Sequence, residues 1–252
     1  AASAPGAGAL PAATWARGRR HLGHNGTFMV FRQLAQDVPA FRRFVAEASE
    51  ASAARGPALN PEQVGAKMVG RWASGAPVAV YADADPGHPG ENAFGYHEED
   101  QAGFRCPPGA HVRRSNPRDS STSNPDKALR STMNHRILRR GRPYGELLPE
   151  VPTAEEEQAE RGLLFLCLNT DVERQFEFVQ HTWLDNGFFA GLCGEVDPVV
   201  GRQREGGGVA TLPAKPVRRR LEGVPQLVTT RGGGYFFLPG IKALRWLASM
   251  GS

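Results

Sequence analysis

An apolar run at residues 161–169, R-G-L-L-F-L-C-L-N, constrains the fold of this chain more than any other segment. It has the length of a strand, and its continuous apolar character predicts that the strand is buried. The segment after it carries apolar residues at spacings of four, three and four, namely Val172, Phe176, Val179 and Trp183. This spacing predicts an amphipathic helix, for which Asp171 is the expected N-cap.

A second strand–helix pair is predicted near the beginning of the chain. Residues 27–35 are rich in β-branched and aromatic side chains behind a glycine, which indicates a strand. Val38, Phe41 and Val45 then fall on one face of a predicted helix. A further helix begins after Asn60, because the motif N-P-E-Q supplies a cap, a proline at the first helical position and a glutamine at the third.

The remaining segments complete the expected architecture. Residues 225–240 predict two strands around a Gly-Gly-Gly turn, and residues 240–250 predict a closing helix. Residues 74–160 are rich in Gly, Pro, Asp and Ser and predict long ordered loops, which in a compact chain usually carry function. This order of elements predicts an α+β fold, with a ferredoxin-like split βαβ sheet and helices on one of its faces.

Composition argues against several classes of function. The net charge is only +4, although arginines cluster at residues 136–142 and 218–220. No zinc-finger spacing, recognition-helix motif or interleaved aromatic pattern accompanies these clusters, so no nucleic-acid partner is expected. The three cysteines form no C-x-x-C pair and are too few for a disulfide scaffold. No apolar run is long enough to span a membrane, so no membrane partner is expected.

The first twenty residues differ in composition from the rest of the chain. They are alanine-rich and lack the apolar core of a signal peptide, so residues 1–20 are expected to form a flexible leader. Sparse cysteines and this leader favour a cytoplasmic location and leave secretion open.

The motif R-C-P-P-G-A-H-V-R-R-S-N-P-R at residues 105–118 places one histidine after a stiff turn. His111 can act as a metal ligand, a base or a hydrogen-bonding side chain, and a lone loop histidine is most often structural. Arg113, Arg114 and Arg118 add positive charge that favours an anion. A ligand that is both a metal and a dianion would satisfy both parts of this motif.

Six segments share their order with one family of proteins. They occupy residues 22–41, 94–120, 135–145, 160–184, 195–201 and 229–245. Together they resemble the C-terminal portion of dye-decolorizing (DyP-type) haem peroxidases, from about residue 22 to the end. The resemblance implies that residues 21–252 form a C-terminal haem-binding domain. This domain would be half of a two-module fold and would pair with an N-terminal half.

The resemblance also implies roles for single residues. The histidine of the family's C-P-x-G-A-H-[IV]-R-R-x-N-P-R motif ligates the haem iron, which makes His111 the expected metal ligand of haem b (iron protoporphyrin IX). Arg113 or Arg114 would bind the haem propionates. The first arginine of the family's I-L-R-R-x-x-P-[YF]-G motif lies on the distal side of the haem. Arg139 is therefore the expected catalytic residue, although outside the motif it would be one surface cation among several.

Further cofactor-binding residues follow from the same resemblance. Leu163 and Phe165 match apolar residues of the family's distal pocket, whereas without the family they would be assigned to the core alone. A carboxylate of the family hydrogen-bonds the proximal histidine. The segment E-V-D-P-V-V-G implies Asp197 for this role, with Glu195 as the alternative.

One motif of the family is absent from residues 1–252. Longer members carry G-x-x-D-G, whose aspartate moves the peroxide proton, and this sequence contains no match. The expected function is that of the haem-bearing part of a peroxidase, which uses hydrogen peroxide to oxidise dyes, phenolics or other small reducing substrates. The expected partner is a second polypeptide with the missing half. The alternative is a haem-binding or accessory subunit without turnover.

Overall fold

A four-stranded antiparallel sheet forms the centre of the computed structural model, which describes residue 10 and residues 20–53 and 58–250. The strands are β1 (Thr27–Gln36), β2 (Leu138–Tyr144), β3 (Gly162–Asn169) and β6 (Val228–Leu238). They are hydrogen-bonded in the order β2–β3–β1–β6, which is the order of a ferredoxin-like sheet. The expected α+β fold is therefore confirmed. Most of the expected leader lies outside the described residues.

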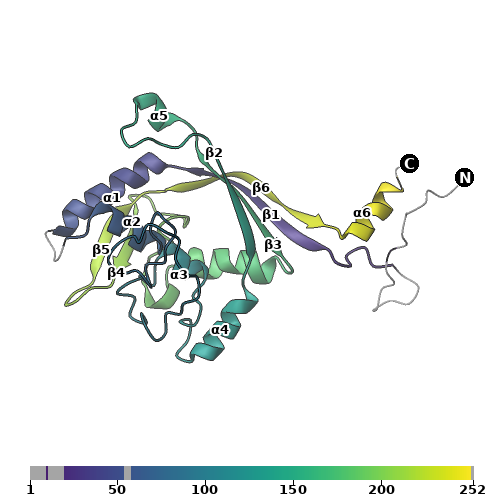
Figure 1. Cartoon of the computed structure of the whole chain (residues 1–252), viewed down its shortest axis with the longest axis horizontal. Coiled ribbons are helices and arrows are strands. Elements are labelled where there is room, and N and C mark those ends of the chain that lie inside the picture. The colour runs from purple at the N-terminus through teal and green to yellow at the C-terminus, as the bar shows by residue number, and fades with distance from the viewer. Residues whose placement is uncertain (1–9, 11–19, 54–57, 251–252) are drawn as a thin grey trace, which may run out of the picture.

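Helices and a small hairpin pack around this sheet (Figure 1). The helices are α1 (Val38–Ala53), α2 (Pro61–Val69), α3 (His111–Ser115), α4 (Pro125–Asn134), α5 (Ala154–Gln158) and α6 (Ile241–Ala248). The segment after β3 contains η1 (Glu173–Glu177), η2 (Val179–Leu184) and η3 (Phe189–Gly191), and the hairpin consists of β4 (Gly208–Leu212) and β5 (Arg219–Val224). In Figure 1, α3 and α4 lie below the sheet, whereas α6 lies at its far end. Within the described ranges, no helix combines the length and apolar character needed to cross a membrane.

The largest core joins α1 and α2 to the β4–β5 hairpin. Phe44 of α1 and Met68 of α2 are buried in one cluster with Leu221 of β5. The start of α2 follows the predicted capping pattern. The side chain of Asn60 accepts the N–H of Gln63 at 2.8 Å, and the Gln63 side chain accepts the N–H of Asn60 at 3.0 Å.

The register between strands determines which side chains share a face of the sheet. Arg139 of β2 lies opposite Cys167 of β3, which in turn lies opposite Val30 of β1. Residues opposite each other in neighbouring strands project to the same face, and residues two apart along a strand do so as well. Leu163 and Phe165 therefore share the face of Arg139. Val30 and Cys167 are buried on this face in a cluster with η1.

Residues 74–160 are mostly loop, as expected, but they include the strand β2, which the sequence did not predict. Its sequence, L-R-R-G-R-P-Y, contains arginines, a glycine and a proline, which are poor predictors of a strand. β2 is an edge strand of the sheet, and an edge strand tolerates proline because its outer N–H groups have no partner strand. The helices α4 and α5 also lie in this region.

Residues 225–240 form one strand rather than the two that the sequence predicted. The three glycines at 232–234 continue β6 along β1 instead of turning. A Cβ atom on Gly233 would lie 2.3 Å from the carbonyl oxygen of Phe31, so glycine here permits a close approach of the two backbones. Glycine therefore marks a crowded position in this strand, which sequence alone does not distinguish from a turn.

The helix predicted after β3 forms, but it winds differently. The Asp171 carboxylate accepts the N–H of Arg174 at 2.9 Å, as expected of an N-cap. Phe176, Val179 and Trp183 are buried, as their spacing predicted. The turns η1 and η2 are π-helical rather than α-helical, a widened geometry that is frequent near functional sites.

Candidate functional site

His111 is the first residue of α3 and follows a tightly packed turn. The N–H of Ala110 donates to the carbonyl of Pro107 at 3.0 Å, which closes the turn before the helix begins. Cys106 and Ala110 are fully buried on either side of the two prolines. The two prolines restrict the backbone of the turn, and burial restricts the residues on either side of it. The position of the His111 side chain is therefore well defined.

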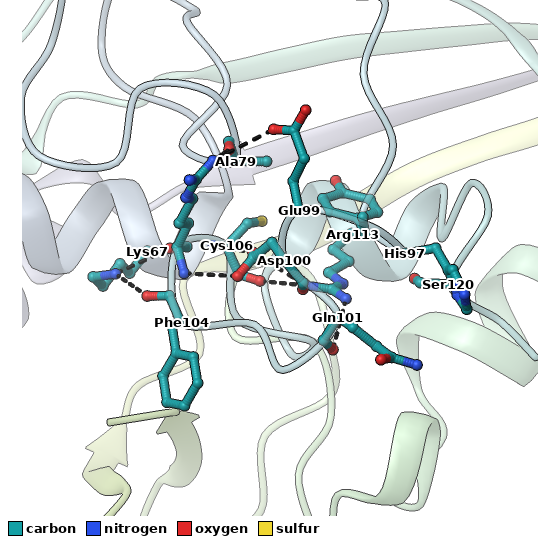
Figure 2. Close-up of polar contacts among 12 residues, drawn as sticks. Lys67, Ala79, His97, Glu99, Asp100, Gln101, Phe104, Cys106, Arg113 and Ser120 are labelled. Atoms are coloured by element: carbon teal, nitrogen blue, oxygen red, sulfur yellow. Dashed lines mark hydrogen bonds and ion pairs between the residues drawn. The ribbon is translucent and has the colours of Figure 1, made fainter. Parts of the chain in front are cut away.

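Arg113 is hydrogen-bonded to the start of this turn (Figure 2). Its Nη1 donates to the carbonyl oxygens of Cys106 at 2.7 Å and Asp100 at 2.9 Å, and it lies 3.4 Å from the Asp100 carboxylate. The guanidinium also stacks over Tyr96, 4.3 Å from the ring centroid. The same carboxylate accepts the N–H groups of Arg105 and Cys106, at 2.9 and 2.7 Å. Arg113 is therefore committed to partners inside the protein.

Arg114 is fully buried and joins α3 to three other segments. Its guanidinium donates to the carbonyl oxygens of Trp183 at 2.9 Å, Asn186 at 3.1 Å and Glu195 at 2.5 Å. Its Nε donates to the carbonyl oxygen of Gly109 at 3.2 Å. Both arginines that directly follow the turn thus have internal carbonyl partners. The expectation that one of them binds a haem propionate gains no support from these contacts.

A carboxylate lies against the imidazole of His111. Its Nδ1 is 3.0 Å from Oδ2 of Asp197, whose side chain is fully buried. Oδ1 of Asp197 accepts the N–H groups of Val199 and Val200, each at 2.9 Å, so the carboxylate is held on both sides. Glu195, the alternative from sequence, bonds instead to Thr211 of β4. The structure therefore brings Asp197, and not Glu195, to His111.

The electrostatics of this pair follow from burial and charge. Burial favours the neutral imidazole, but the Asp197 carboxylate outweighs it, so the pKa of His111 is raised. Burial also opposes ionisation of Asp197, yet the imidazole and the two N–H groups hold the pKa of this carboxyl below its usual value. The Arg139 guanidinium lowers the pKa of His111 and so lies within electrostatic range of it. With Nδ1 engaged, Nε2 is the ring nitrogen left to bind a metal.

The sheet brings together the other three predicted site residues. Arg139, Leu163 and Phe165 share one face, where the arginine is exposed and the two apolar side chains are half-buried. Gly141 lies opposite Phe165, and a Cβ atom there would come within 2.9 Å of Leu163. This glycine leaves room beside the apolar pair. The sequence did not single out Gly141. Once residues 138–144 are known to form a strand, Gly141 follows as the next residue on the same face as Arg139.

Buried polar atoms without a partner gather around the same loops. Among the residues described, six side chains have such an atom, and four of them lie between residues 97 and 132. The four atoms are His97 Nδ1, Asn116 Oδ1, Arg118 Nε and Thr132 Oγ1. Because buried polar groups are normally hydrogen-bonded, each of these atoms is available to a water molecule or a ligand.

These features fit an iron porphyrin with carboxylate arms. No three His, Cys, Asp or Glu side chains converge as ion ligands in the described part of the chain, so a metal at His111 would need ligands from another source. A porphyrin supplies four nitrogens and takes a histidine as an axial ligand. Of the unpaired polar atoms, Arg118 Nε and Thr132 Oγ1 can donate to a carboxylate, whereas Asn116 Oδ1 can only accept.

Comparison with known proteins gives one consistent result. A family model described as "Dyp-type peroxidase, C-terminal" matches residues 8–188. The chain is 33% identical over 238 residues to a multifunctional dye peroxidase of Amycolatopsis sp., covering 89% of this chain and 49% of that protein. It is 34% identical over 250 residues to Peroxidase 2 of Mycetinis scorodonius, covering 88% and 46%. The chain thus spans about half the length of the curated relatives it matches.

Solved structures give the same picture. The fold matches a DyP-type peroxidase of Anabaena sp. with a TM-score of 0.76 and 31% identity, over 88% of this chain and 46% of that one. It matches a fungal DyP-type peroxidase of Auricularia auricula-judae with a TM-score of 0.73 and 30% identity, over 96% and 57%. In both, the matched part is about half of the larger protein.

Proposed function

The chain belongs to the DyP-type peroxidase family, and on this premise we propose that it forms the haem-binding half of a peroxidase. Hydrogen peroxide would be reduced to water by two electrons, taken one at a time from small reducing substrates. The observation that carries the proposal is the contact between His111 and Asp197, with Nδ1 3.0 Å from Oδ2, which leaves Nε2 of the histidine available to a metal. Names of the relatives, such as "dye-decolorizing peroxidase", suggest dyes as test substrates.

In this proposal His111 ligates the iron of haem b through Nε2. Asp197 accepts a hydrogen bond from Nδ1 and fixes the tautomer and the orientation of the ring. Because this carboxylate is fully buried and ionised, it also makes the imidazole a more basic ligand. The two backbone N–H groups that bond its other oxygen keep the carboxylate from rotating away.

Arg139 is the proposed catalytic residue. Bound haem would supply the redox chemistry of peroxide reduction. The Arg139 guanidinium would stabilise negative charge on a peroxide oxygen. Leu163 and Phe165 share its face and would exclude water there, which strengthens the interaction by lowering the local dielectric.

The acid–base group of this reaction is proposed to lie in sequence beyond these 252 residues. The curated relatives carry about twice the matched length in one chain. The half that bears the G-x-x-D-G motif can belong to the same polypeptide or to a second one, with the same chemical role. An accessory haem-binding subunit without turnover is the alternative.

Two measurements on the same preparation test the proposal. Titration with haemin should give a 1:1 complex with the visible spectrum of a histidine-ligated haem. Once the half with the G-x-x-D-G motif is added, peroxide should drive oxidation of an anthraquinone dye or a phenol. Absence of a haem complex would refute the proposal altogether. A haem complex without peroxide turnover, in the presence of the G-x-x-D-G half, would favour the accessory subunit.

A further inference from the structure

Hydrogen bonds at two consecutive residues attach the segment between α4 and β2 to the π-helical turns. Nδ1 of His135 lies 2.5 Å from the carbonyl oxygen of Arg174, and because a carbonyl oxygen only accepts, Nδ1 carries the proton. Nε2 of Gln175 donates to the carbonyl oxygen of Arg136 at 2.5 Å. His135 and Arg136 are therefore bonded to two consecutive residues of η1.

Ring packing and apolar burial strengthen this attachment. The imidazole of His135 lies parallel to the Phe178 ring, with centroids 3.6 Å apart and 7° between the planes, and it meets the Trp183 ring edge to face at 5.4 Å. Ile137 packs against the buried cluster that contains Cys167. All three residues before β2 are thus attached to the π-helical turns or to the core beside them.

The amide of Gln175 is itself held in one orientation. Its Oε1 accepts the N–H groups of Thr170 at 2.7 Å and Asp171 at 3.1 Å, and also the Thr170 hydroxyl at 3.1 Å. With the amide oxygen engaged by three donors, the amide nitrogen is left to donate to Arg136. A glutamate at this position would keep the acceptor and lose the donor.

Arg139 lies where such an anchor matters most. It is the second residue of β2, its side chain is exposed, and β2 pairs only with β3 because it is an edge strand. The ends of exposed strands open more readily than the centre of a sheet. Gly141, two residues further on, adds backbone freedom. The anchored residues 135–137 directly precede this weak end of the strand.

The other end of the π-helical turns is bonded to the helix of His111. The carbonyl oxygen of Trp183, in η2, accepts Nη1 of Arg114 at 2.9 Å, and Arg114 belongs to α3 together with His111. One π-helical segment therefore connects the strand that carries Arg139 to the helix that carries His111.

We propose that His135 and Gln175 are positioning residues for Arg139. They attach the start of β2 to the π-helical turns and so fix the separation between the Arg139 guanidinium and the His111 helix. The inference rests on the proposed function, in which both residues act on the same haem. Because a displacement of about 1 Å by a distant substitution can cost on the order of a hundredfold in rate, a partial loss of this anchor should have a measurable effect.

Amide hydrogen exchange of the haem-free protein, followed by mass spectrometry, tests the anchor without the cofactor. His135→Ala removes the hydrogen bond and the stacking, and Gln175→Glu removes only the donor to Arg136. Arg174→Ala is the matched control, because His135 bonds to the backbone carbonyl of residue 174, which alanine retains. Exchange in residues 138–144 should rise about threefold to tenfold in both site variants and stay unchanged in the control. Unaltered exchange in both site variants would overturn the inference.

A double-mutant cycle separates positioning from a general loss of structure. With haem and the G-x-x-D-G half present, His135→Ala should slow the reaction with peroxide by about tenfold at unchanged haem affinity. The same substitution should have no further effect in Arg139→Ala protein, because His135 acts only through that residue. His135→Asn, whose amide can donate to the Arg174 carbonyl, should recover part of the rate. Equal losses in both backgrounds would assign His135 a purely structural role and overturn the inference.

The two measurements also separate this inference from the proposed function. If the unmodified protein binds no haem, the proposed function fails, while hydrogen exchange still tests the anchor. If exchange confirms the anchor but His135→Ala reacts with peroxide at the normal rate, the positioning role is wrong and the proposed function stands.

Discussion

Nδ1 of His111 lies 3.0 Å from Oδ2 of Asp197 although 86 residues separate the two in the sequence. Arg114 links the helix α3, which carries His111, to the segment that carries Asp197. It donates to the carbonyl oxygen of Glu195, two residues before Asp197, while its own backbone belongs to the same helix as His111. The buried arginine therefore positions the carboxylate that positions the histidine. Arg114→Ala should weaken this pair without touching it directly.

Replacing Arg139 with alanine should leave the haem spectrum intact and slow the reaction with peroxide by about a hundredfold or more, the usual cost of removing one preorganised donor. Stopped-flow spectroscopy of the haem complex after mixing with peroxide measures this rate. Arg140→Ala is the matched control, because the neighbouring residue of β2 projects to the opposite face. Equal slowing in both variants would contradict the distal role of Arg139.

Replacing Asp197 with asparagine should destabilise the haem-free protein in a pH-dependent way. The raised pKa of His111 gives stability that is present below its ordinary value of 6.5 and is lost as pH rises through the folded pKa. The lowered pKa of Asp197 gives stability that is present above 3.8 and is lost as pH falls through the folded pKa. Urea unfolding should show the largest loss, about 1 to 3 kcal/mol, between these two values. A loss that is constant with pH would indicate packing rather than the ion pair.

The three cysteines should differ sharply in reactivity. Burial raises the pKa of Cys106 to about 12 and also raises the pKa of Cys167, so neither forms a thiolate at neutral pH. Cys193 is exposed. Ellman's reagent should therefore label one thiol per chain in the native protein and three after unfolding. Rapid native labelling in a Cys193→Ser variant would show that the core around Cys106 or Cys167 opens readily.

Two glycines with left-handed backbones should tolerate alanine differently. Gly145, which follows β2, has φ of 77°, and a Cβ atom there would lie 2.3 Å from the carbonyl oxygen of Glu160. Gly191 has φ of 79°, but nothing lies within 4 Å of its added Cβ. Gly191→Ala should cost only the backbone strain, about 1 to 2 kcal/mol. Gly145→Ala should cost more in the same denaturant titration, and equal losses would contradict the close approach at this turn.

Periodicity and caps were sufficient to predict the elements that bury one continuous face. The helix after residue 170 is confirmed, with Phe176, Val179 and Trp183 buried, and so is the strand before it, although most apolar side chains of that strand are half-buried rather than buried. β2 was missed because an edge strand that borders the candidate site carries arginine, glycine and proline, none of which favours a strand. The turn expected at residues 232–234 was wrong because these glycines continue a strand, in which Gly233 permits a close approach to the backbone of Phe31.

The sequence predicted the type of site, but it did not predict every contact of the site residues. The motif around His111 resembles that of one family, which directs attention to Arg139 and Asp197. Local pattern could not choose between Asp197 and Glu195, because the choice depends on contacts across the fold. Nor could it distinguish Arg114 from Arg118. The guanidinium of Arg114 donates to internal carbonyl oxygens, whereas Nε of Arg118 has no partner, and distant segments determine this difference.

Ligation of haem iron by His111 is the central claim, and the visible and electron paramagnetic resonance spectra of the His111→Gly variant test it most directly. The account predicts that haem in this variant loses the spectrum of a histidine-ligated iron. Added imidazole, which can occupy the space of the missing side chain, should restore that spectrum. A variant whose haem spectrum matches that of the unmodified protein before imidazole is added would show that another residue holds the iron.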